Sequence, residues 1–250
     1  MAYNVAPQHM KVVAIIPARI ASTRLPRKIL REIAGQTMLQ RVYEAARGCS
    51  ALADVIVATD SNEILAVCER NGWSARLTSA THRSGTDRVH EVAQSVPADV
   101  YINVQGDEPL AHPDHVNALV ELMKNPGRDV GTIKTPCPPQ DIDNPNAVKV
   151  VTDAHGRALY FSRSPIPFDR DKKGDVRYFK HLGFYAYRKP ALDRFCSLPE
   201  STLERSERLE QLRFLENGIP IYVTETIHDT IGVDTEDDLR RVEGLILARS

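Results

Sequence analysis

The chain has 250 residues, 42% of them hydrophobic and 26% charged, which is the composition of a folded domain with a substantial core rather than of a disordered chain. Its formal net charge of −1 argues against general nucleic-acid binding, which requires a basic surface over much of a fold. No apolar run approaches the roughly 18 residues of a membrane span, and residues 1–11 lack the apolar region of a signal peptide, so we expect no membrane partner.

The first half of the chain alternates buried strands with helices. Continuous apolar runs rich in β-branched residues are typical of strands buried on both faces, and they predict strands at residues 11–18, 53–60 and 99–109. Apolar residues at helical spacing predict helices at residues 37–49, 61–72 and 113–124. This alternation predicts an α/β fold with a three-layer, mostly parallel sheet and helices on both faces.

The pattern changes in the second half of the chain. After a strand at 129–136, two alternating runs within residues 146–168 flank a turn at 153–156 and predict a hairpin. We therefore expect a mixed sheet in a single domain over residues 1–250, with a hairpin-bearing excursion at about 137–187 that is used in dimerisation. The remaining predicted elements are strands at 179–188 and 219–227 and helices at 201–218 and 234–249.

The cysteines are widely spaced, at Cys49, Cys68, Cys137 and Cys196. They form neither a CxxC pair nor a Cys/His zinc spacing, so we expect free thiols in a reducing compartment. The protein is accordingly expected to be cytoplasmic.

The loop PARIASTRLPRK (residues 17–28) concentrates positive charge after the first predicted strand, and no Asp or Glu occurs before Glu32. The loop contains neither GxGxxG nor GxxxxGK[ST], so its cations must act through their side chains. Arg19 can contact two phosphate oxygens with its guanidinium fork and Lys28 can add a point charge, which suits a polyphosphate. The alternative is a solvated basic loop before a helix.

Acidic side chains follow the other predicted strands. Ligands of open parallel sheets bind outside the carboxyl ends of the strands, where Asp60 ends the second strand and Asp107 follows the third in QGDEP. A carboxylate near phosphates indicates Mg²⁺, which takes one or two protein carboxylates and completes its coordination with water and phosphate oxygens. The alternative for Asp107 is a solvated turn. His112 and His115 in HPDH are interpreted as residues of a helix start, not as a metal pair.

A series of motifs follows in one order: IIPARIASTRLPRK, IVATD, HRSGTDR, NVQGDEP, NPNAVKVV, YFSRSPIPFDRD, HLGFYAYR, LEQLR and GVDTEDDL. Their order and spacing resemble the 3-deoxy-manno-octulosonate cytidylyltransferase (CMP-KDO synthetase) family from about Lys11 to the C-terminus. The first motif also marks other sugar-acid cytidylyltransferases, including sialic acid activators, and the later motifs narrow the resemblance to the octulosonate branch.

The resemblance implies a nucleotide-binding sheet and a nucleotidyltransferase that transfers CMP from CTP to the anomeric hydroxyl of 3-deoxy-D-manno-octulosonate (KDO). The products would be diphosphate and CMP-KDO for lipopolysaccharide biosynthesis. Catalysis needs no covalent enzyme intermediate and consists mostly of positioning and charge neutralisation. The implied catalytic residues are Arg19, Lys28 and Asp107, and Asp107 with Asp234 would bind the cofactor Mg²⁺.

The same resemblance implies two sets of binding residues. The nucleotide would contact Arg19, Lys28, Ser84, Gly85, Thr86 and Gln105. The sugar acid would contact His181, Tyr185, Glu210 and Gln211, with Arg163 and Arg24 as candidates for its carboxylate. The alternatives are a plain loop before a helix for 84–86, an interior strand residue for Tyr185 and a solvated helix residue for Glu210.

Two departures from the family pattern are Arg27, where relatives often have Gly, and Ile231, where a small residue is common. Arg27 adds a cation beside the expected triphosphate, and Ile231 can alter a turn near Asp234. The competing functions are a cytidylyltransferase for 8-amino-KDO or a sialic acid, a catalytically silent nucleotide-binding protein, and an NAD-dependent dehydrogenase. The missing GxGxxG argues against the dehydrogenase.

Overall fold

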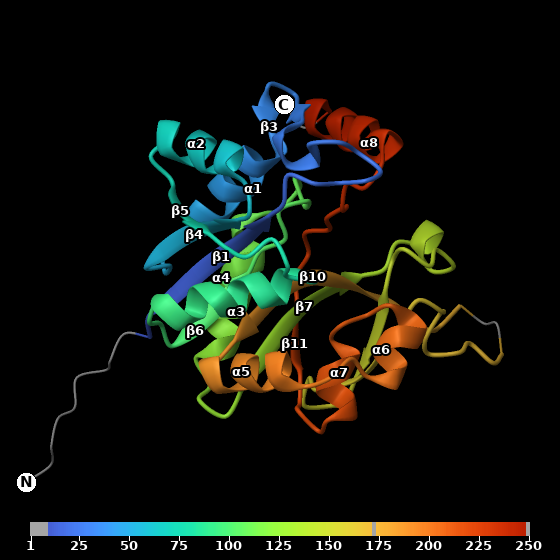
Figure 1. Ribbon diagram of the computed structural model, residues 1–250. Helices are drawn as coiled ribbons and strands as arrows, with labels where there is room; N and C mark the ends of the chain where they lie inside the picture. Colours follow the sequence, from blue (N-terminus) through green and yellow to red (C-terminus); the bar gives the residue numbers. More distant parts are fainter. Residues whose placement is uncertain (1–9, 172–173, 249–250) are drawn as a thin grey trace, which may run out of the picture.

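The computed structural model of the chain describes residues 10–171 and 174–248. Most of its strands form one mixed sheet (Figure 1). Along the order β11-β7-β10-β6-β1-β4-β5, the strand β10 (Phe179–Tyr187) is antiparallel to both neighbours and the other pairs are parallel. The other strands are β1 (Val12–Ala18), β4 (Asp54–Thr59), β5 (Ser74–Leu77), β6 (Val100–Asn103), β7 (Val130–Pro136) and β11 (Tyr222–Glu225). The expectation for the N-terminal segment falls largely on residues 1–9, which lie outside the described residues.

Helices cover both faces of this sheet, which confirms the predicted α/β class. Alternate side chains of β1 separate the two layers, since Ala14 and Ile16 pack with one set of helices and Val13 and Ile15 with the other. The first set is α1 (Met38–Arg47), α2 (Asn62–Arg70) and α4 (Pro113–Met123), and the second is α3 (Gly85–Ser95), α5 (Lys189–Ser197) and α7 (Leu212–Glu216). β1 is therefore buried on both sides, as its apolar run predicts.

The predicted hairpin forms as β8 (Lys149–Thr152) and β9 (Ala158–Ser162). Its turn contains Gly156 at φ 77°, a left-handed conformation that glycine adopts without steric cost. β8 joins the main sheet by pairing with β10, so the excursion is an extension of the sheet.

The prediction of a single helix at 201–218 was wrong. Two short helices occupy this stretch, α6 (Thr202–Glu207) and α7, because Arg208 adopts a left-handed conformation with φ 55° that ends α6. The sequence analysis also missed α5, the short edge strand β5 and the small hairpin of β2 (Glu32–Ile33) and β3 (Gln36–Thr37). These strands have two to four residues, too few for periodicity to be recognised.

Residues 226–234, here called the crossing segment, connect β11 to the closing helix α8 (Glu236–Leu247), which lies at the top of Figure 1. α8 packs on the loop after β1 through a separate apolar cluster of Leu25, Ile33, Met38, Val233, Leu239 and Val242. The end of the chain is thereby fixed beside the cation-rich loop at its beginning. The predicted end of this helix at residue 249 lies outside the described residues.

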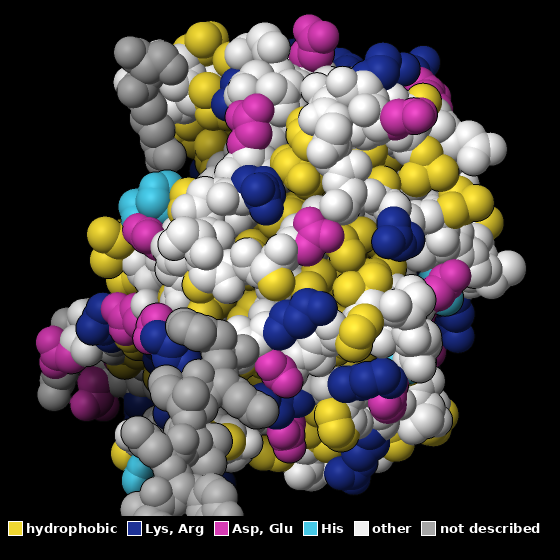
Figure 2. Space-filling view, turned by 90° about the vertical axis from the view of Figure 1, so that its left-hand side faces the viewer, with side chains coloured by type: hydrophobic (Ala, Val, Ile, Leu, Met, Phe, Trp, Pro, Cys, Tyr) yellow, Lys and Arg dark blue, Asp and Glu magenta, His cyan; other side chains and the backbone are white. Residues whose placement is uncertain are grey.

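The surface agrees with the small net charge. On the face in Figure 2, Lys and Arg side chains are interspersed with Asp and Glu and do not form a continuous basic area. None of the helices in the described ranges combines the length and apolar character needed to cross a membrane. All four cysteines are free thiols, as their spacing predicts.

Candidate active site

A cavity of about 280 Å³ opens at the carboxyl ends of β1 and β6. It gathers residues that are up to 217 positions apart (17 to 234) in the sequence. The predicted site residues that line it are Arg19, Arg24, Lys28, Gly85, Gln105, Asp107 and Asp234. The crevice outside the strand ends, where open α/β sheets bind ligands, thus contains most of the expected nucleotide and metal residues.

Gly106 explains why the loops after β1 and β6 meet here. A Cβ atom at this position would lie 2.7 Å from the Pro17 carbonyl oxygen and 2.8 Å from Ile29 Cδ1. Such contacts are too short, so only glycine lets the two loops pack this closely. The close approach brings Asp107 to Lys28.

Lys28 lies between two carboxylates. Its Nζ atom is 2.8 Å from Asp107 Oδ2 and 3.0 Å from Asp234 Oδ1. Burial lowers the pKa of Lys28, but the charges and hydrogen bonds of Asp107 and Asp234 outweigh burial and raise its pKa above the ordinary value. The ammonium is therefore charged at neutral pH, and Arg24 adds a further, more exposed cation 3.0 Å from Asp234 Oδ2.

The crossing segment holds Asp234 in place through its backbone. The Val233 N–H donates to the Asp107 carbonyl oxygen at 2.9 Å, and the Asp234 N–H donates to Asp238 at 3.1 Å. The capping box of α8 is formed by Thr235 and Asp238. The Asp234 carboxylate is consequently not used as a helix cap and faces Lys28 and the cavity.

Arg19 has no directly contacting counterion within residues 10–171 and 174–248. Its side chain makes no hydrogen bond or ion pair with the residues that the structure describes. Burial and then the positive charge of Arg88 lower its pKa, although Asp60 and Asp87 act in the opposite sense. Since neither acidic group contacts it, a bound anion is the partner that would stabilise this guanidinium.

Arg88, which the sequence analysis did not single out, forms an ion pair with Asp60. Its Nη2 atom donates to Asp60 Oδ2 at 2.5 Å, and its side chain is fully buried. One carboxylate oxygen of Asp60, which follows β4, is thus held in an ion pair, while its other oxygen, Oδ1, is buried without a hydrogen-bond partner among the described residues. The sequence contained a signal for this ion pair, because the motifs IVATD and HRSGTDR each contain a charged residue, Asp60 and Arg88, to which no role had been given.

Residues 84–86 form the N-cap and first residues of α3, close to the alternative of a loop before a helix. Ser84 and Gly85 also line the two cavities. Ser84 is the N-cap of α3 in a capping box with Asp87. A Cβ on Gly85 would lie 3.4 Å from Pro17 Cγ and 3.6 Å from Gln105 Oε1, so this backbone lies close to Gln105, another predicted nucleotide contact. Thr86 is buried, and its hydroxyl donates to Glu210 Oε1 at 2.6 Å.

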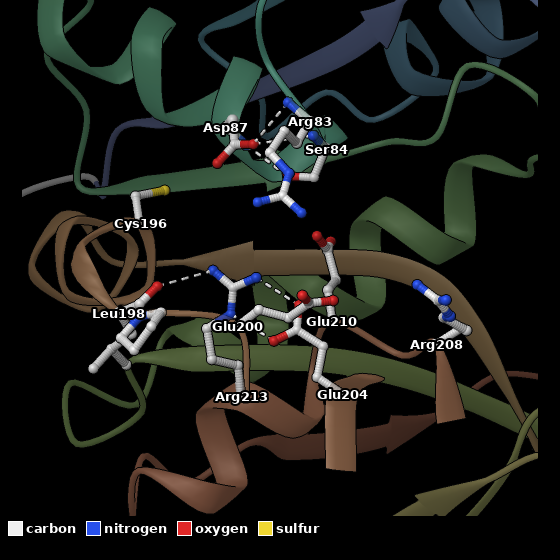
Figure 3. Close-up of a pocket in the computed structure, with 11 residues that line it drawn as sticks. Arg83, Ser84, Asp87, Cys196, Leu198, Glu200, Glu204, Arg208, Glu210 and Arg213 are labelled. Carbon is white, nitrogen blue, oxygen red and sulfur yellow. Dashed lines mark hydrogen bonds and ion pairs between the residues drawn. The ribbon is translucent and has the colours of Figure 1, made fainter. Parts of the chain in front are cut away.

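A second cavity, of about 440 Å³, adjoins Ser84 (Figure 3). Figure 3 shows Arg83, Ser84 and Asp87 on one side, with Glu210 and Arg213 pointing toward them from the other. Arg213 is paired with Glu204 through two hydrogen bonds, of 2.5 and 2.8 Å. The guanidinium groups of Arg83 and Arg208, by contrast, have no hydrogen-bond or ion-pair partner among the described residues that line this cavity.

Glu210 lies in the break between α6 and α7, not on a solvated helix. Burial raises its pKa, opposed by the hydrogen bond from Thr86. Tyr185 is buried on β10, as the interior alternative proposes, and its hydroxyl has no hydrogen-bond partner in the described structure. Burial, then Tyr187 and Glu210, raise the pKa of Tyr185 well above its ordinary value, which places Glu210 in its electrostatic environment.

The other predicted sugar residues do not line either cavity. Arg163 donates to the carbonyl oxygens of Glu207, Pro145 and Arg208 at 2.6, 2.8 and 3.3 Å. His181 is buried beside Thr132, with 2.9 Å between Nε2 and Oγ1, and burial lowers its pKa to about 3. Gln211 is buried at the start of α7.

The two family departures have structural explanations. Arg27 has φ 56°, a conformation that suits glycine, and its side chain is ion-paired with Glu63 of α2. It is not among the residues lining the cavity, so it does not add a cation there. Ile231 packs against the apolar cluster under α8.

Comparison with known proteins gives a consistent result. The family model for cytidylyltransferase matches residues 13–227. A 3-deoxy-manno-octulosonate cytidylyltransferase of Koribacter versatilis (strain Ellin345) is 73% identical over 96% of this chain and 92% of its own, and one of Acidobacterium capsulatum is 57% identical over 96% and 98%. A solved structure of CMP:2-keto-3-deoxy-manno-octonic acid synthetase complexed with CTP is 43% identical, with a TM-score of 0.92 over 96% of this chain and 100% of that one.

Proposed function

The chain belongs to the cytidylyltransferase family, and we propose that it transfers CMP from CTP to the anomeric hydroxyl of KDO, with release of diphosphate. The observation that carries this proposal is the cavity in which Arg19 lacks a counterion and Lys28 lies between Asp107 and Asp234. Arg19 holds the triphosphate, and Lys28 stabilises the charge that develops as diphosphate leaves. The CMP-KDO product serves lipopolysaccharide biosynthesis.

The donor set of this cavity fits Mg²⁺. Two carboxylates from distant segments converge on one ammonium, and carboxylate oxygens are the protein ligands that Mg²⁺ prefers. Asp107 and Asp234 would hold the ion, which would neutralise phosphate charge and make the sugar hydroxyl more acidic. Lys28 holds both carboxylates toward the cavity and so prepares the site for phosphate and ion together.

The nucleotide base lies toward Gly85 and Gln105. With no side chain at Gly85, a flat ring can approach the backbone at the start of α3, and the Gln105 amide oxygen can accept a hydrogen bond from the cytosine amine. Uracil presents an acceptor at that position, so fixed acceptors discriminate against it strongly. Ser84 and Thr86 support this wall through the N-cap and the bond to Glu210.

The sugar acid occupies the second cavity, which adjoins the first at Ser84 and Gly85. Glu210 accepts hydrogen bonds from sugar hydroxyls, and the unpaired Arg83 and Arg208 are the cations that can bind its carboxylate. Arg163 acts through the backbone of Glu207 and Arg208, which it holds in place. His181, Tyr185 and Gln211 remain proposed contacts at the base of this region, and Arg24 remains one on the nucleotide side.

We further propose that the protein is a homodimer and acts in the cytoplasm. The excursion exposes Leu159 on β9 and Phe168 after it, with 60% and 80% of their surface accessible, which suits contact with a second copy. Four free thiols are typical of a reducing compartment, which is also where CTP is available.

The test is diphosphate release by the full chain with Mg²⁺, using CTP or UTP with KDO, 8-amino-KDO or sialic acid. We expect release with CTP and KDO, and a preference for CTP over UTP well above the roughly 10 to 200-fold that apolar fit alone provides. Release only with another sugar acid would replace the proposed substrate, and CTP binding without release from any of them would indicate a silent binding protein.

A further inference from the structure

A cluster of metal-binding side chains lies outside both cavities, where the N-terminus of α4 meets the crossing segment. His112 is the N-cap of α4, Asp114 lies in its first turn and His228 comes from the crossing segment. His228 Nε2 is 3.0 Å from Asp114 Oδ2, and His112 Nδ1 is 3.4 Å from the same oxygen. One ligand atom of each residue lies within 4.8 Å of the other two.

The separations of 3.0 and 3.4 Å are close to those of ligands that share one small ion. Zinc-ligand bonds of about 2.0–2.2 Å at tetrahedral angles place two ligand atoms about 3.3–3.6 Å apart. The two imidazole rings are stacked, with centroids 3.8 Å apart, and His112 Nδ1 accepts a hydrogen bond from the Asp114 N–H at 3.2 Å. One ring must therefore rotate, and His112 must either give up this capping bond or bind through Nε2, for both lone pairs to point at the ion. Both side chains are partly exposed, at 44% for His112 and 34% for His228, which leaves room for this rotation.

His115 fixes the cluster without joining it. Its Nδ1 accepts from the His112 N–H at 3.2 Å, and its Nε2 donates to the His228 carbonyl oxygen at 2.9 Å. Both ring nitrogens are therefore occupied, and the ring is buried. The backbone of both proposed histidine ligands is thus held by one rigid neighbour, which reduces the conformational freedom that ion binding would otherwise remove.

We propose that His112, Asp114 and His228 bind one divalent transition-metal ion of the Zn²⁺ class and so tie the crossing segment to α4. Two imidazoles and a carboxylate select Zn²⁺, Co²⁺ or Ni²⁺ over Mg²⁺, which prefers oxygen ligands only. Three protein ligands leave a further position for water. The ion fixes the start of the crossing segment, whose far end carries Asp234, and it is distinct from the ion proposed at Asp107.

The experiment titrates Co²⁺ into the untagged full chain in excess Mg²⁺, followed by calorimetry and by the visible spectrum of the bound ion. We expect one ion per chain, with a spectrum that lacks thiolate-to-cobalt charge transfer. His112→Asn and His228→Asn should each weaken binding by more than about 100-fold, since even outer residues of metal sites contribute roughly 10 to 100-fold. The matched control is His155→Asn, which removes an exposed histidine of the β8–β9 turn and should leave binding unchanged.

Thermal unfolding gives a second measurement that does not depend on the ion's spectrum. Zn²⁺ should raise the unfolding temperature of the wild-type chain and of His155→Asn, and EDTA should reverse the rise; both cluster variants should show none, while retaining the wild-type circular dichroism. Undiminished binding in either cluster variant, a thiolate signature, or no binding at one equivalent would overturn the proposal. If a cluster variant loses the wild-type circular dichroism, Asp114→Asn takes its place with the same expectation.

Discussion

Lys28 is the side chain on which the charge balance of the first cavity depends. It is 15% exposed and contacts two carboxylates from different ends of the chain, whereas most surface lysines contact water or one flexible partner. The loop is exposed at Arg24 and Arg27, but the Lys28 ammonium at its end is largely enclosed by the carboxylates of the proposed magnesium site.

We predict that Lys28→Ala lowers kcat by roughly 10² to 10³-fold, the effect of removing one group that stabilises transition-state charge. The fold should survive, because Asp107 and Asp234 are partly exposed and can be solvated when the ammonium is removed. The measurement is diphosphate release at saturating CTP, together with the unfolding temperature. Lys124→Ala, which removes an exposed lysine paired with Glu121, is the control, and a Lys28→Ala enzyme as fast as this control would refute the role.

The buried His181 side chain leads to a prediction about how the stability of the fold depends on pH. Burial lowers its pKa from 6.5 to about 3, so the imidazole is neutral in the folded protein. Between these values the unfolded chain binds more protons than the folded one; stability present above pH 6.5 is lost as the pH falls. At pH 5 this amounts to about 2 kcal/mol.

We therefore expect wild type to lose about 2 kcal/mol more unfolding free energy than His181→Gln between pH 7.5 and pH 5, because glutamine cannot bind this proton. Urea unfolding at both pH values measures the difference. An equal loss in the two proteins would show that His181 is already protonated in the folded state. Other groups that titrate in both proteins cancel in this comparison.

At the scale of elements, the N-terminus of α8 places a helix-capping residue, Thr235, next to a proposed metal ligand, Asp234. Thr235 and Asp238 form the capping box, and Asp234, one residue earlier, directs its carboxylate at Lys28. Two adjacent residues thus face different partners, although the sequence DTEDD, which indicates a capping box of Thr235 and Asp238, leaves a helix-start role open for Asp234 as well. A structural role for Asp234 and a metal-binding role can be distinguished by comparing these neighbours.

We predict that Asp234→Asn lowers turnover severely and raises the Mg²⁺ concentration required, with little change in unfolding temperature, since asparagine keeps one oxygen but loses the charge. Thr235→Ala should do the opposite: it should cost about 1 kcal/mol of stability through loss of the cap and leave the Mg²⁺ requirement near that of wild type. Both variants are compared in turnover, Mg²⁺ titration and thermal unfolding. If Asp234→Asn keeps normal turnover at unchanged Mg²⁺ demand, Asp234 is not a metal ligand.

The break between α6 and α7 is the second element with a functional consequence. A continuous helix over 201–218 would present its residues at fixed helical spacing. The left-handed Arg208 instead ends α6, and Glu210 in the break reaches Thr86 of α3. The second cavity exists between these elements because the helix stops there.

At the scale of the whole molecule, the excursion is a part of the fold that exposes large apolar side chains, Leu159 and Phe168. β8 pairs with the edge of β10, and β9 follows it with Leu159 exposed. Apolar groups at the end of a sheet extension favour association with an identical extension, since a two-fold interface buries the same patch on both copies.

We expect the chain to have twice its monomer mass in light scattering at micromolar concentration. Leu159→Asp combined with Phe168→Asp should shift it to the monomer mass while preserving its circular dichroism. Leu247→Asp, on a leucine that is 61% exposed at the end of α8, is the matched control and should remain dimeric. A wild-type monomer, or a double variant that stays dimeric, would remove the excursion from the interface.

The sequence by itself determined the elements whose signal is local. The apolar run of β1 predicts a doubly buried strand, the turn at 153–156 predicts the hairpin, and the order of strands and helices predicts the layers. The sequence also predicted that Arg19, Lys28 and Asp107 lie together, because residues that follow parallel strands meet at one edge of the sheet.

Only the tertiary structure decided which charges are free and which are paired. Asp60 and Arg163 have the residue types of ligands, but Asp60 pairs with Arg88 and Arg163 donates to three backbone carbonyls. Arg83, whose motif HRSGTDR gave it no role, and Arg208, which lies in no motif, have guanidinium groups without a partner among the described residues that line the second cavity. The approach of His228 to His112 and Asp114 is equally invisible in the sequence. Such pairings depend on distances across the fold between residues far apart in the chain, and spacing along the sequence contains no information about those distances.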